Sequence, residues 1–284
     1  MQSWATYKLG VTGEFDVLPT IGSKEFVAWL PTFLQSKTVL YPEVAYPTYL
    51  VGSMIAGATA QAVGIDAKEW PTADLAWINS PSNPTGQVQS EAELAAVINW
   101  SRQHNAIAAS DECYLSFASD AKSILSVANG NNTNLISVHS LSKRSNLAGY
   151  RAGFIVGDSK LIAQIREIRK HAGMMVPLPV QKAMVAALSD ETHVVQQENR
   201  YNQRREILKN ALEKSGFKIE FSTAGLYIWC TKDEDCWSTV DWFATRGVLV
   251  TPGVFYGKGG EKFVRIALTA SDEKIKQTAE RISQ

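Results

Sequence analysis

Short apolar segments alternate with helical patterns through the middle of this 284-residue chain, and that alternation limits the folds open to it. Three segments, residues 75–79, 106–110 and 135–139, are nearly continuous in small or apolar residues, as expected of strands buried on both faces. Strands that alternate with helices form βαβ units, which build a mostly parallel sheet covered by helices. The sequence therefore predicts an α/β fold.

Two of the helices are marked by their ends. Ser90 and Glu93 can form a capping box, which predicts a helix over residues 90–103. A second helix is expected after Ser159, with Gly173 as its stop signal. The face that this second helix is expected to bury is a stripe of apolar residues: Leu161, Ile165, Ile168 and Ala172.

The pattern changes in the last third of the chain. A long, charged helical stretch over residues 191–215 leads to an alternating strand pattern over residues 225–229. We take this change as a domain boundary. Residues 1–190 are predicted to form a large α/β domain, and residues 191–284 a smaller α+β domain.

Charge and cysteine content exclude several classes of protein. The 28 basic and 28 acidic residues cancel, so the chain offers no net positive charge for nucleic acid or acidic membranes. Its three cysteines have no short paired spacing, which fits a reducing compartment and provides no zinc pair. No apolar run approaches the roughly 18 residues of a membrane span, and the first residues lack the pattern of a signal peptide. We expect a cytoplasmic protein.

Polar residues follow each of the three predicted strands. The first strand leads into residues 80–86, the second into residues 111–114 and the third into residues 140–143. Ligands of open α/β sheets bind outside the carboxyl ends of the strands. An amide, a carboxylate with a phenol, and a hydroxyl with an amine are therefore expected to face one crevice.

These groups suit the chemistry of pyridoxal phosphate. A lysine just past a buried strand, such as Lys143, can be desolvated, which makes its amine available for Schiff-base formation. Asp111 can hold a protonated ring nitrogen, and Asn83 and Tyr114 can donate to the ring oxygen. Each motif alone is more often a turn, a helix cap or a surface residue. Their order along the chain, each at a strand end or helix start, favours a shared site.

The phosphate of such a cofactor needs an anion site. An apolar helical run is expected to begin at Gly22, Ser23 and Lys24, where backbone N–H groups and the helix dipole favour an anion. Ser140 and Arg151 are expected to complete this site.

Residues 80–86, 111–114 and 140–154 resemble the signature blocks of class I and II aminotransferases, which are fold-type-I pyridoxal phosphate enzymes. The resemblance extends from about residue 17 to the C-terminus. It implies the fold-type-I architecture, transaminase activity with pyridoxal 5'-phosphate, small amino acid and 2-oxo acid substrates, and a homodimer.

The resemblance also implies roles for single residues. Lys143 would form the Schiff base and carry the proton, and Asp111 would pair with the pyridine nitrogen. Tyr114, together with Asn83, would bond the ring oxygen, which makes Lys143, Asp111 and Tyr114 the predicted catalytic residues. Arg265, aided by Asn83, would bind the substrate carboxylate through its planar fork. The remaining predicted cofactor-binding residues include the aromatic residue expected to stack on the ring, Tyr46, and the phosphate-binding group Gly22, Ser23, Lys24, Ser140 and Arg151.

Longer blocks allow a finer comparison. Residues 145–151, 169–177 and 241–247 resemble the actinobacterial type of succinyldiaminopimelate aminotransferase. That family transfers an amino group between glutamate and N-succinyl-2-amino-6-oxopimelate in lysine and diaminopimelate biosynthesis. Its members usually begin well upstream of the position that matches Met1, so the large domain is expected to be incomplete at its N-terminus.

Other interpretations stay open. Another fold-type-I enzyme, such as a different aminotransferase or a C–S lyase, would share Lys143 and Asp111, and a truncated cofactor-binding protein would show no turnover. A nucleotide-binding enzyme is disfavoured because no GxGxxG motif follows a strand. No metal site is expected, since the four histidines are scattered without helical pairing.

Overall fold

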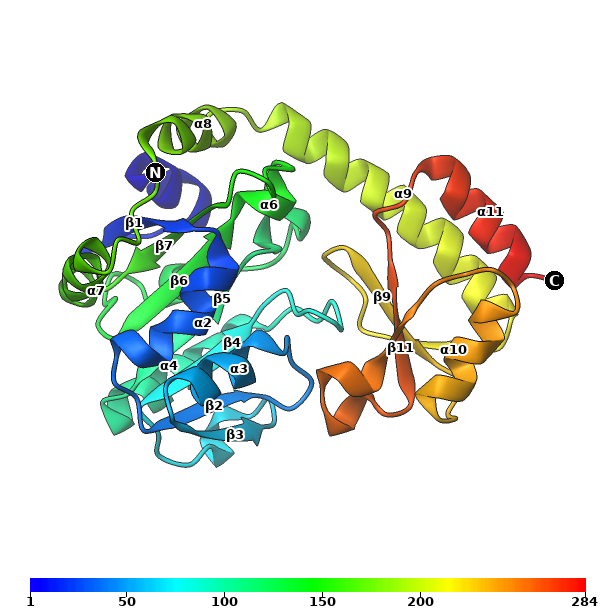
Figure 1. The fold of residues 1–284 in the computed structure, drawn as a ribbon, viewed down its shortest axis with the longest axis horizontal. Coiled ribbons are helices and arrows are strands. Elements are labelled where there is room, and N and C mark those ends of the chain that lie inside the picture. The colour runs from blue at the N-terminus through cyan, green and yellow to red at the C-terminus, as the bar shows by residue number, and fades with distance from the viewer.

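The three predicted strands lie at the centre of a seven-stranded sheet in the computed structural model, which describes residues 1–284. They are β4 (Leu75–Asn79), β5 (Ile107–Asp111) and β6 (Leu135–Ser140), and they run parallel to one another. Every residue of β4 and β6 is buried, as their apolar composition requires. The prediction of an α/β fold is confirmed (Figure 1).

The sheet has the strand order β1-β7-β6-β5-β4-β2-β3. β7 is antiparallel to both of its neighbours, β1 and β6, whereas the other neighbouring strands are parallel. The sheet is therefore mostly parallel, as predicted. The four strands outside the central three are β1 (Asp16–Ile21), β2 (Thr38–Pro42), β3 (Thr59–Val63) and β7 (Ala152–Gly157).

Helices cover both faces of this sheet, and an apolar cluster fills each face. One face packs against α2 (Ser23–Phe33), α3 (Thr48–Ile55) and α7 (Ser159–His171). The other cluster includes residues of α4 (Glu91–His104), α5 (Ile124–Val127) and α8 (Leu178–Leu188). It also includes residues of the helical turn Ala5–Leu9, which follows the short α1 (Gln2–Trp4).

The two predicted helices are present, but one buries a different face from the expected one. α4 begins with the expected capping box, in which Ser90 Oγ accepts from the Glu93 amide and Glu93 Oε2 accepts from the Ser90 amide. Ile168 of α7 and Ala172, which directly follows the helix, are exposed, so that part of the prediction is wrong. Arg169 is buried instead because its Nη1 donates to Glu25 Oε1 of α2 over 2.6 Å.

A second lobe contains the four-stranded antiparallel sheet β10-β11-β9-β8. It has its own apolar core. Its strands are β8 (Lys218–Glu220), β9 (Tyr227–Thr231), β10 (Thr251–Pro252) and β11 (Phe263–Ala267). β9 begins later than the predicted strand over residues 225–229, since residues 225 and 226 lie in a turn.

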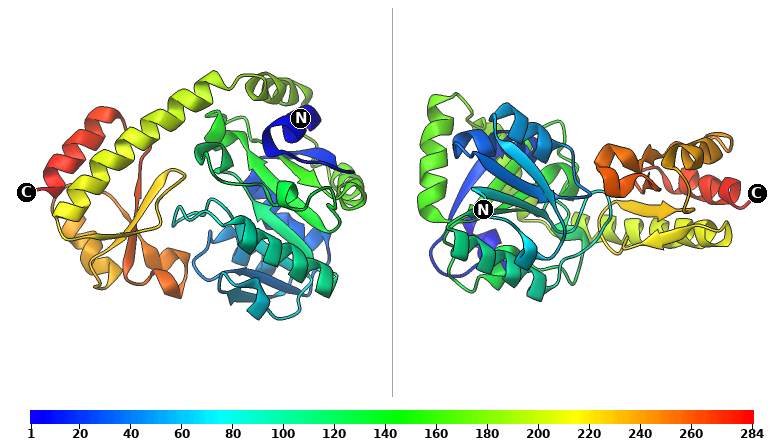
Figure 2. Two further views of the ribbon diagram at one scale, coloured as in Figure 1. Left: turned by 180° about the vertical axis from the view of Figure 1, so that it is seen from behind. Right: turned by 90° about the horizontal axis from the view of Figure 1, so that it is seen from below.

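One long helix connects the two lobes. α9 (Thr192–Lys214) runs from the end of α8 across to the second sheet, where it packs against α11 (Asp272–Ile282); α10 (Cys236–Ala244) also belongs to this lobe (Figure 2). The predicted division after residue 190 falls between α8 and α9 and stays a prediction. None of the helices combines the length and apolar character needed to cross a bilayer.

Candidate active site

A cavity of 480 Å³ lies at the carboxyl ends of β4, β5 and β6, and residues of both lobes line it. It contains every predicted site residue except Gly22, which precedes the lining residue Ser23. The predicted residues that line the cavity are Ser23, Lys24, Tyr46, Asn83, Asp111, Tyr114, Ser140, Lys143, Arg151 and Arg265. The convergence of polar loops expected from the strand order is therefore present.

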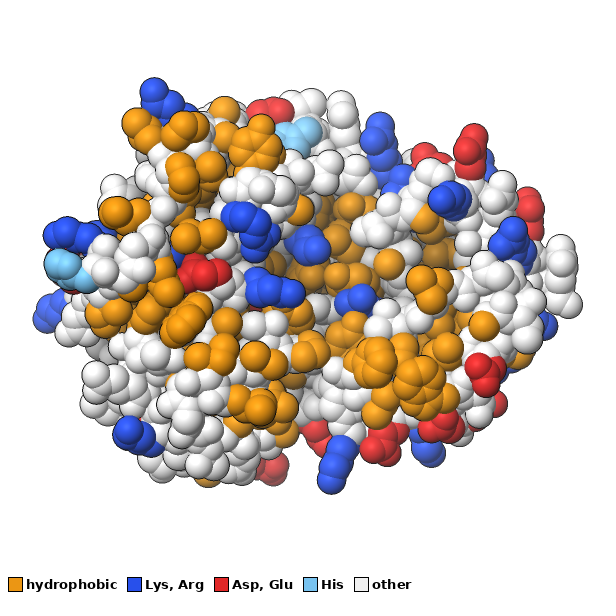
Figure 3. All heavy atoms as spheres, viewed as in Figure 1, with side chains coloured by type: hydrophobic (Ala, Val, Ile, Leu, Met, Phe, Trp, Pro, Cys, Tyr) orange, Lys and Arg blue, Asp and Glu red, His pale blue; other side chains and the backbone are white.

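Positive charge dominates this cavity. Its lining includes the cations Lys24, Lys143, Arg151 and Arg265 but a single carboxylate, Asp111. None of the four cations forms an ion pair. In Figure 3 several Lys and Arg side chains lie in the hollow between the lobes. An anionic ligand would find partners there that no protein carboxylate occupies.

Asp111, the last residue of β5, is a buried carboxylate in a fixed orientation. It is 6% exposed. The Tyr49 hydroxyl donates to Asp111 Oδ2 over 2.9 Å, and the Cys113 amide donates to Oδ1 over 3.2 Å. Burial raises the pKa of Asp111, whereas the hydrogen bonds from Cys113 and Tyr49 act to lower it. A cationic ring nitrogen in this cavity would supply the counter-charge that the carboxylate lacks.

Lys143 lies on α6 (Leu141–Arg144), a single turn that begins directly after β6. Ser140 caps this turn, since its Oγ accepts from the Ser142 amide over 3.2 Å. The expectation of a desolvated lysine is wrong, because Lys143 is exposed on the cavity side of the turn. Its neighbour Arg144 is buried instead and pairs with Glu191. The Lys143 amine is accordingly accessible to a ligand.

The start of α2 lies in close contact with Arg151. Gly22 has φ +72°, and a Cβ at this position would lie 2.5 Å from Arg151 Nη2. The guanidinium of Arg151 therefore lies directly against the helix N-terminus, and its Nη1 donates to the Ala148 carbonyl over 3.0 Å. The free N–H groups of a first helical turn, together with a guanidinium, suit a phosphate.

Arg265 reaches the cavity from β11 in the second lobe. Its Nη1 donates to Asn83 Oδ1 over 2.8 Å, so the two lobes meet at this pair. The Asn83 oxygen is thereby occupied, and its amide N–H groups face no protein acceptor. A planar cation with no carboxylate partner is well suited to bind a substrate carboxylate.

Several residues in and beside the cavity have no role predicted from the sequence. Tyr227 lines the cavity and shares the alternation of its strand with Trp229. Tyr49 does not line the cavity but donates to Asp111, and it lies three positions after Tyr46, so a signal existed for both tyrosines. The other lining residues without a predicted role are Asn79, Cys113, Ser142 and Ala148. Their positions beside Asn83, Asp111 and Lys143 gave no chemical reason to select them.

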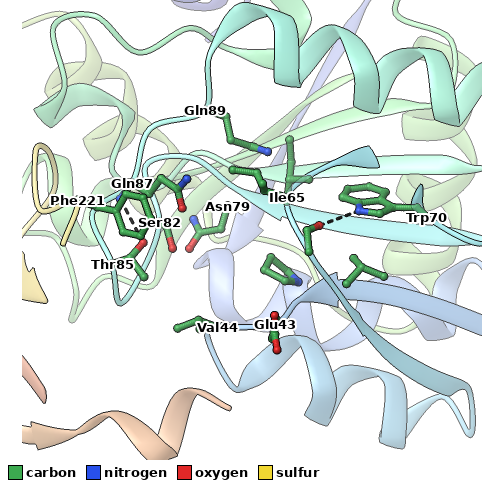
Figure 4. A pocket seen from close by; sticks show the side chains of 14 residues that line it. Glu43, Val44, Ile65, Trp70, Asn79, Ser82, Thr85, Gln87, Gln89 and Phe221 are labelled. Atoms are coloured by element: carbon green, nitrogen blue, oxygen red, sulfur yellow. Dashed lines mark hydrogen bonds between the residues drawn. The ribbon is translucent and has the colours of Figure 1, made fainter. Parts of the chain in front are cut away.

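A second cavity, of 180 Å³, lies beside residues 80–89 and is shown in Figure 4. It shares Asn79 with the first cavity but contains none of the predicted site residues. Apolar side chains such as Trp70 and Ile65 and the amides of Gln87 and Gln89 line it together. It contains no lysine, cysteine or histidine, so we place the candidate chemistry in the first cavity.

Comparisons with known proteins identify the family of this chain. The family model "Aminotransferase class I and II" matches residues 3–282. "Probable aminotransferase Rv1178" of Mycobacterium tuberculosis is 50% identical over 278 residues, which cover 95% of this chain and 66% of that protein. The chain thus spans just under two thirds of that relative. The "4-dedimethylamino-4-oxo-anhydrotetracycline transaminase OxyQ" of Streptomyces rimosus is 46% identical, with 99% and 81% covered.

Solved structures that resemble this chain also include aminotransferases. A probable N-succinyldiaminopimelate aminotransferase from Thermus thermophilus is 28% identical with a TM-score of 0.89, covering 99% of this chain and 81% of that one. An aminotransferase from Staphylococcus aureus, 24% identical with 99% and 80% covered, shares the fold with a TM-score of 0.91. This chain belongs to the class I and II aminotransferases, a family of enzymes that depend on pyridoxal 5'-phosphate.

Proposed function

We propose that this protein is a transaminase whose active site is the 480 Å³ cavity. The observation that carries the proposal is the placement of one accessible amine, Lys143, and one buried carboxylate, Asp111, at the ends of neighbouring strands and in the same cavity. An amine can condense with the aldehyde of pyridoxal phosphate, and a carboxylate can hold its ring nitrogen protonated.

The residues present fit this cofactor group by group. Asp111 is buried without a cation, and the space at Gly22 is too narrow for a Cβ, as expected of a site that closes on a phosphate. Asn83 and Tyr114 are proposed to bond the ring oxygen, and Tyr46 to stack on the ring. The proposed phosphate ligands are the first residues of α2, Gly22, Ser23 and Lys24, with Ser140 and Arg151.

The bound cofactor would supply an electron sink for charge that develops at the substrate α-carbon. The protein's own residues would position the substrate and move the proton. Arg265 and Asn83 would hold the substrate α-carboxylate. Lys143 Nζ would carry the proton between the substrate α-carbon and the cofactor. Asp111 would stay ionised beside the ring nitrogen, and Tyr49 would keep its Oδ2 oriented.

For the substrates, we propose glutamate as amino donor and N-succinyl-2-amino-6-oxopimelate as acceptor. The blocks at residues 145–151, 169–177 and 241–247 support this choice, as does the name of the Thermus thermophilus structure. Four unpaired cations also suit a phosphate together with a substrate that carries several carboxylates. The similarity to OxyQ favours a second candidate, a polycyclic ketone as acceptor.

We further propose that the chain works as a homodimer and that residues 1–190 and 191–284 are separate domains. Sedimentation of the purified protein tests the dimer. Limited proteolysis tests the boundary, with cleavage expected between α8 and α9.

The proposed function is tested by spectroscopy with the purified protein and pyridoxal phosphate. We expect a visible absorption band that changes when glutamate is added, followed by amino transfer to the succinylated acceptor. Lys143→Ala should lose the band and the turnover, because no other amine of the cavity lies at this strand end. The matched control is Lys160→Ala, an exposed lysine of α7.

Three outcomes would change this assignment. If Lys143→Ala keeps the parent spectrum and turnover, the lysine is wrongly assigned. If the parent releases keto products from an amino acid but transfers no amino group to a 2-oxo acid such as 2-oxoglutarate, the protein is a lyase of the same fold. If only the polycyclic ketone accepts the amino group, the substrate proposal is wrong and the transaminase proposal stands.

A further inference from the structure

Tyr227 contacts two groups of the proposed active site that have different tasks. Its ring centroid lies 4.0 Å from Arg265 Cζ, and its hydroxyl lies 3.2 Å from the hydroxyl of Tyr114. Tyr227 and Tyr114 are both buried, and both line the cavity. A single side chain thus connects Arg265, the proposed carboxylate-binding cation, to Tyr114, which is proposed to donate a hydrogen bond to the cofactor ring oxygen.

The ring contact follows from the strand register. β9 and β11 are antiparallel, with Trp229 opposite Arg265 and Tyr227 opposite Ala267. Tyr227 and Arg265 are therefore diagonal neighbours on one face of the sheet, within reach for long and aromatic side chains. Tyr256 contributes a second ring, 5.1 Å from Arg265 Cζ.

These rings hold a cation that has no counter-charge. Arg265 Nη1 donates to Asn83 Oδ1, but its buried Nε has no hydrogen-bond partner and no carboxylate pairs with the guanidinium. A guanidinium over an aromatic face is stabilised by the ring quadrupole and keeps its hydrogen-bonding edge free. The arrangement orients the cation without using the donors that a carboxylate needs.

The hydroxyl contact acts on Tyr114. In a pair of hydroxyls only one donates to the other, so a Tyr114 that donates to a ligand must accept from Tyr227. Burial, followed by the neighbouring Tyr227, raises the pKa of Tyr114 and keeps its hydroxyl protonated. A donation from Tyr227 would make Tyr114 a stronger donor, since hydrogen bonds in a chain polarise one another.

We propose that Tyr227 is a positioning residue with two separable functions: its ring orients Arg265 for the substrate carboxylate, and its hydroxyl orients and strengthens Tyr114 toward the cofactor oxygen. This inference deepens the proposed transaminase function and depends on it for the second part. The first part concerns carboxylate binding alone and can be measured without turnover.

The test compares Tyr227→Phe, which keeps the ring, with Tyr227→Leu and Tyr227→Met, which remove it. The probe for the carboxylate site is glutarate, which is glutamate without the amino group and cannot be transaminated. Calorimetry should show glutarate binding about tenfold weaker in the two ringless variants, because the guanidinium is then no longer held in the orientation that a carboxylate requires. Tyr227→Phe should change the affinity less than about twofold. Tyr256→Leu is the matched control and should weaken binding less than Tyr227→Leu, because its ring is farther away.

The hydroxyl is tested by the pH dependence of the visible spectrum with pyridoxal phosphate bound. Tyr227→Phe should move the pH midpoint upward, because weaker donation by Tyr114 leaves the ring oxygen a stronger base. In a Tyr114→Phe background, Tyr227→Phe should cause no further change, since the effect acts through Tyr114.

Specific results would overturn each part. Equal glutarate affinity in all folded variants, an equal loss in Tyr227→Phe and Tyr227→Leu, or a parent that binds no glutarate would refute the role of the ring. An unchanged midpoint in Tyr227→Phe, or the same shift in the Tyr114→Phe background, would refute the role of the hydroxyl. A parent that binds glutarate but gives no visible band with pyridoxal phosphate contradicts the proposed function and the hydroxyl's role, while the glutarate constants still decide the ring's role.

Discussion

Two adjacent carboxyl groups at the end of β5 have different environments. Asp111 faces the cavity, whereas Glu112 faces the core, is 2% exposed and accepts the Ile124 amide at Oε1 over 2.9 Å. Its Oε2 lies 3.6 Å from His139 Nε2. Burial raises the pKa of Glu112 to about 7 and lowers the pKa of His139 to about 3. Burial thus favours the neutral form of both groups.

This environment predicts a pH-dependent effect of Glu112→Gln on stability. Because the folded pKa lies above the ordinary value of 4.5, the folded state retains a proton that the unfolded state releases. The parent therefore loses stability as pH rises from about 4.5 to about 7, by up to about 3 kcal/mol. Glutamine does not ionise, so the variant should gain about 2 kcal/mol or more relative to the parent between about pH 5 and 8. Denaturant unfolding of the parent and the variant at about pH 5 and pH 8 measures this gain. If the difference in stability between variant and parent is the same at both pH values, the prediction is wrong.

Candidate site residues could be predicted from the sequence where they follow the end of a strand. Lys143, Asp111 and Asn83 were found in this way, and all three line one cavity. The exposure of Lys143 could not be predicted, since it depends on which side of a single helical turn faces the cavity. Tyr49 and Tyr227 contact Asp111 and Arg265, and their spacing from Tyr46 and Trp229 indicates a shared face but does not indicate which functional residue each one contacts.

At the scale of elements, local patterns predicted the type of a segment better than its partners. The strand over residues 75–79 matches β4 because an apolar run ends there at a polar, proline-containing loop. The buried face of α7 was predicted in part wrongly, because apolar periodicity does not reveal that Arg169 finds Glu25 on a distant helix. The start of α2 was predicted correctly, and its close contact with Arg151 is visible only in the structure.

The contact at the start of α2 predicts that Gly22→Ala weakens phosphate binding. Alanine at φ +72° is strained, and its Cβ would displace the Arg151 guanidinium. Affinity for pyridoxal phosphate should fall about tenfold relative to affinity for pyridoxal, which lacks the phosphate; about tenfold is the loss of one charge-assisted hydrogen bond. The control is Gly57→Ala, where φ is +65° but no atom lies within 4 Å of the added Cβ. If affinity for pyridoxal phosphate and for pyridoxal falls equally, Gly22 is needed for the fold and not for phosphate binding.

At the scale of the molecule, the two lobes meet at the loop of residues 80–86. The Ser222 amide donates to the Thr85 carbonyl over 2.9 Å, and Thr223 Oγ1 donates to the Gly86 carbonyl over 3.3 Å. The Asn83–Arg265 hydrogen bond crosses between the lobes at the same loop. The loop was identified from the sequence by its chemistry, but its contact with the second lobe depends on how the two sheets are placed. The geometry of the proposed carboxylate site therefore depends on the arrangement of the two lobes.

This arrangement predicts that Gly86→Ala weakens carboxylate binding without removing the cofactor. Gly86 has φ +68°, and an added Cβ would lie 2.8 Å from the Ala224 carbonyl oxygen and 3.0 Å from Ser222 Cα. The backbone of the second lobe must move away, which separates Arg265 from Asn83 and from the substrate carboxylate. We expect the KM for glutamate and the dissociation constant of glutarate to rise about tenfold, equivalent to about 1.4 kcal/mol, while the visible band with pyridoxal phosphate is retained.

Gly57→Ala again separates strain from contact, since its φ of +65° is similar and its surroundings are open. If Gly57→Ala raises the dissociation constant of glutarate as much as Gly86→Ala, the effect comes from general destabilisation and not from the lobe contact. If Gly86→Ala leaves glutarate binding unchanged, the two lobes adjust without moving Arg265. In that case the carboxylate site is set within the second lobe, by the rings around the guanidinium, and not by the contact between the lobes.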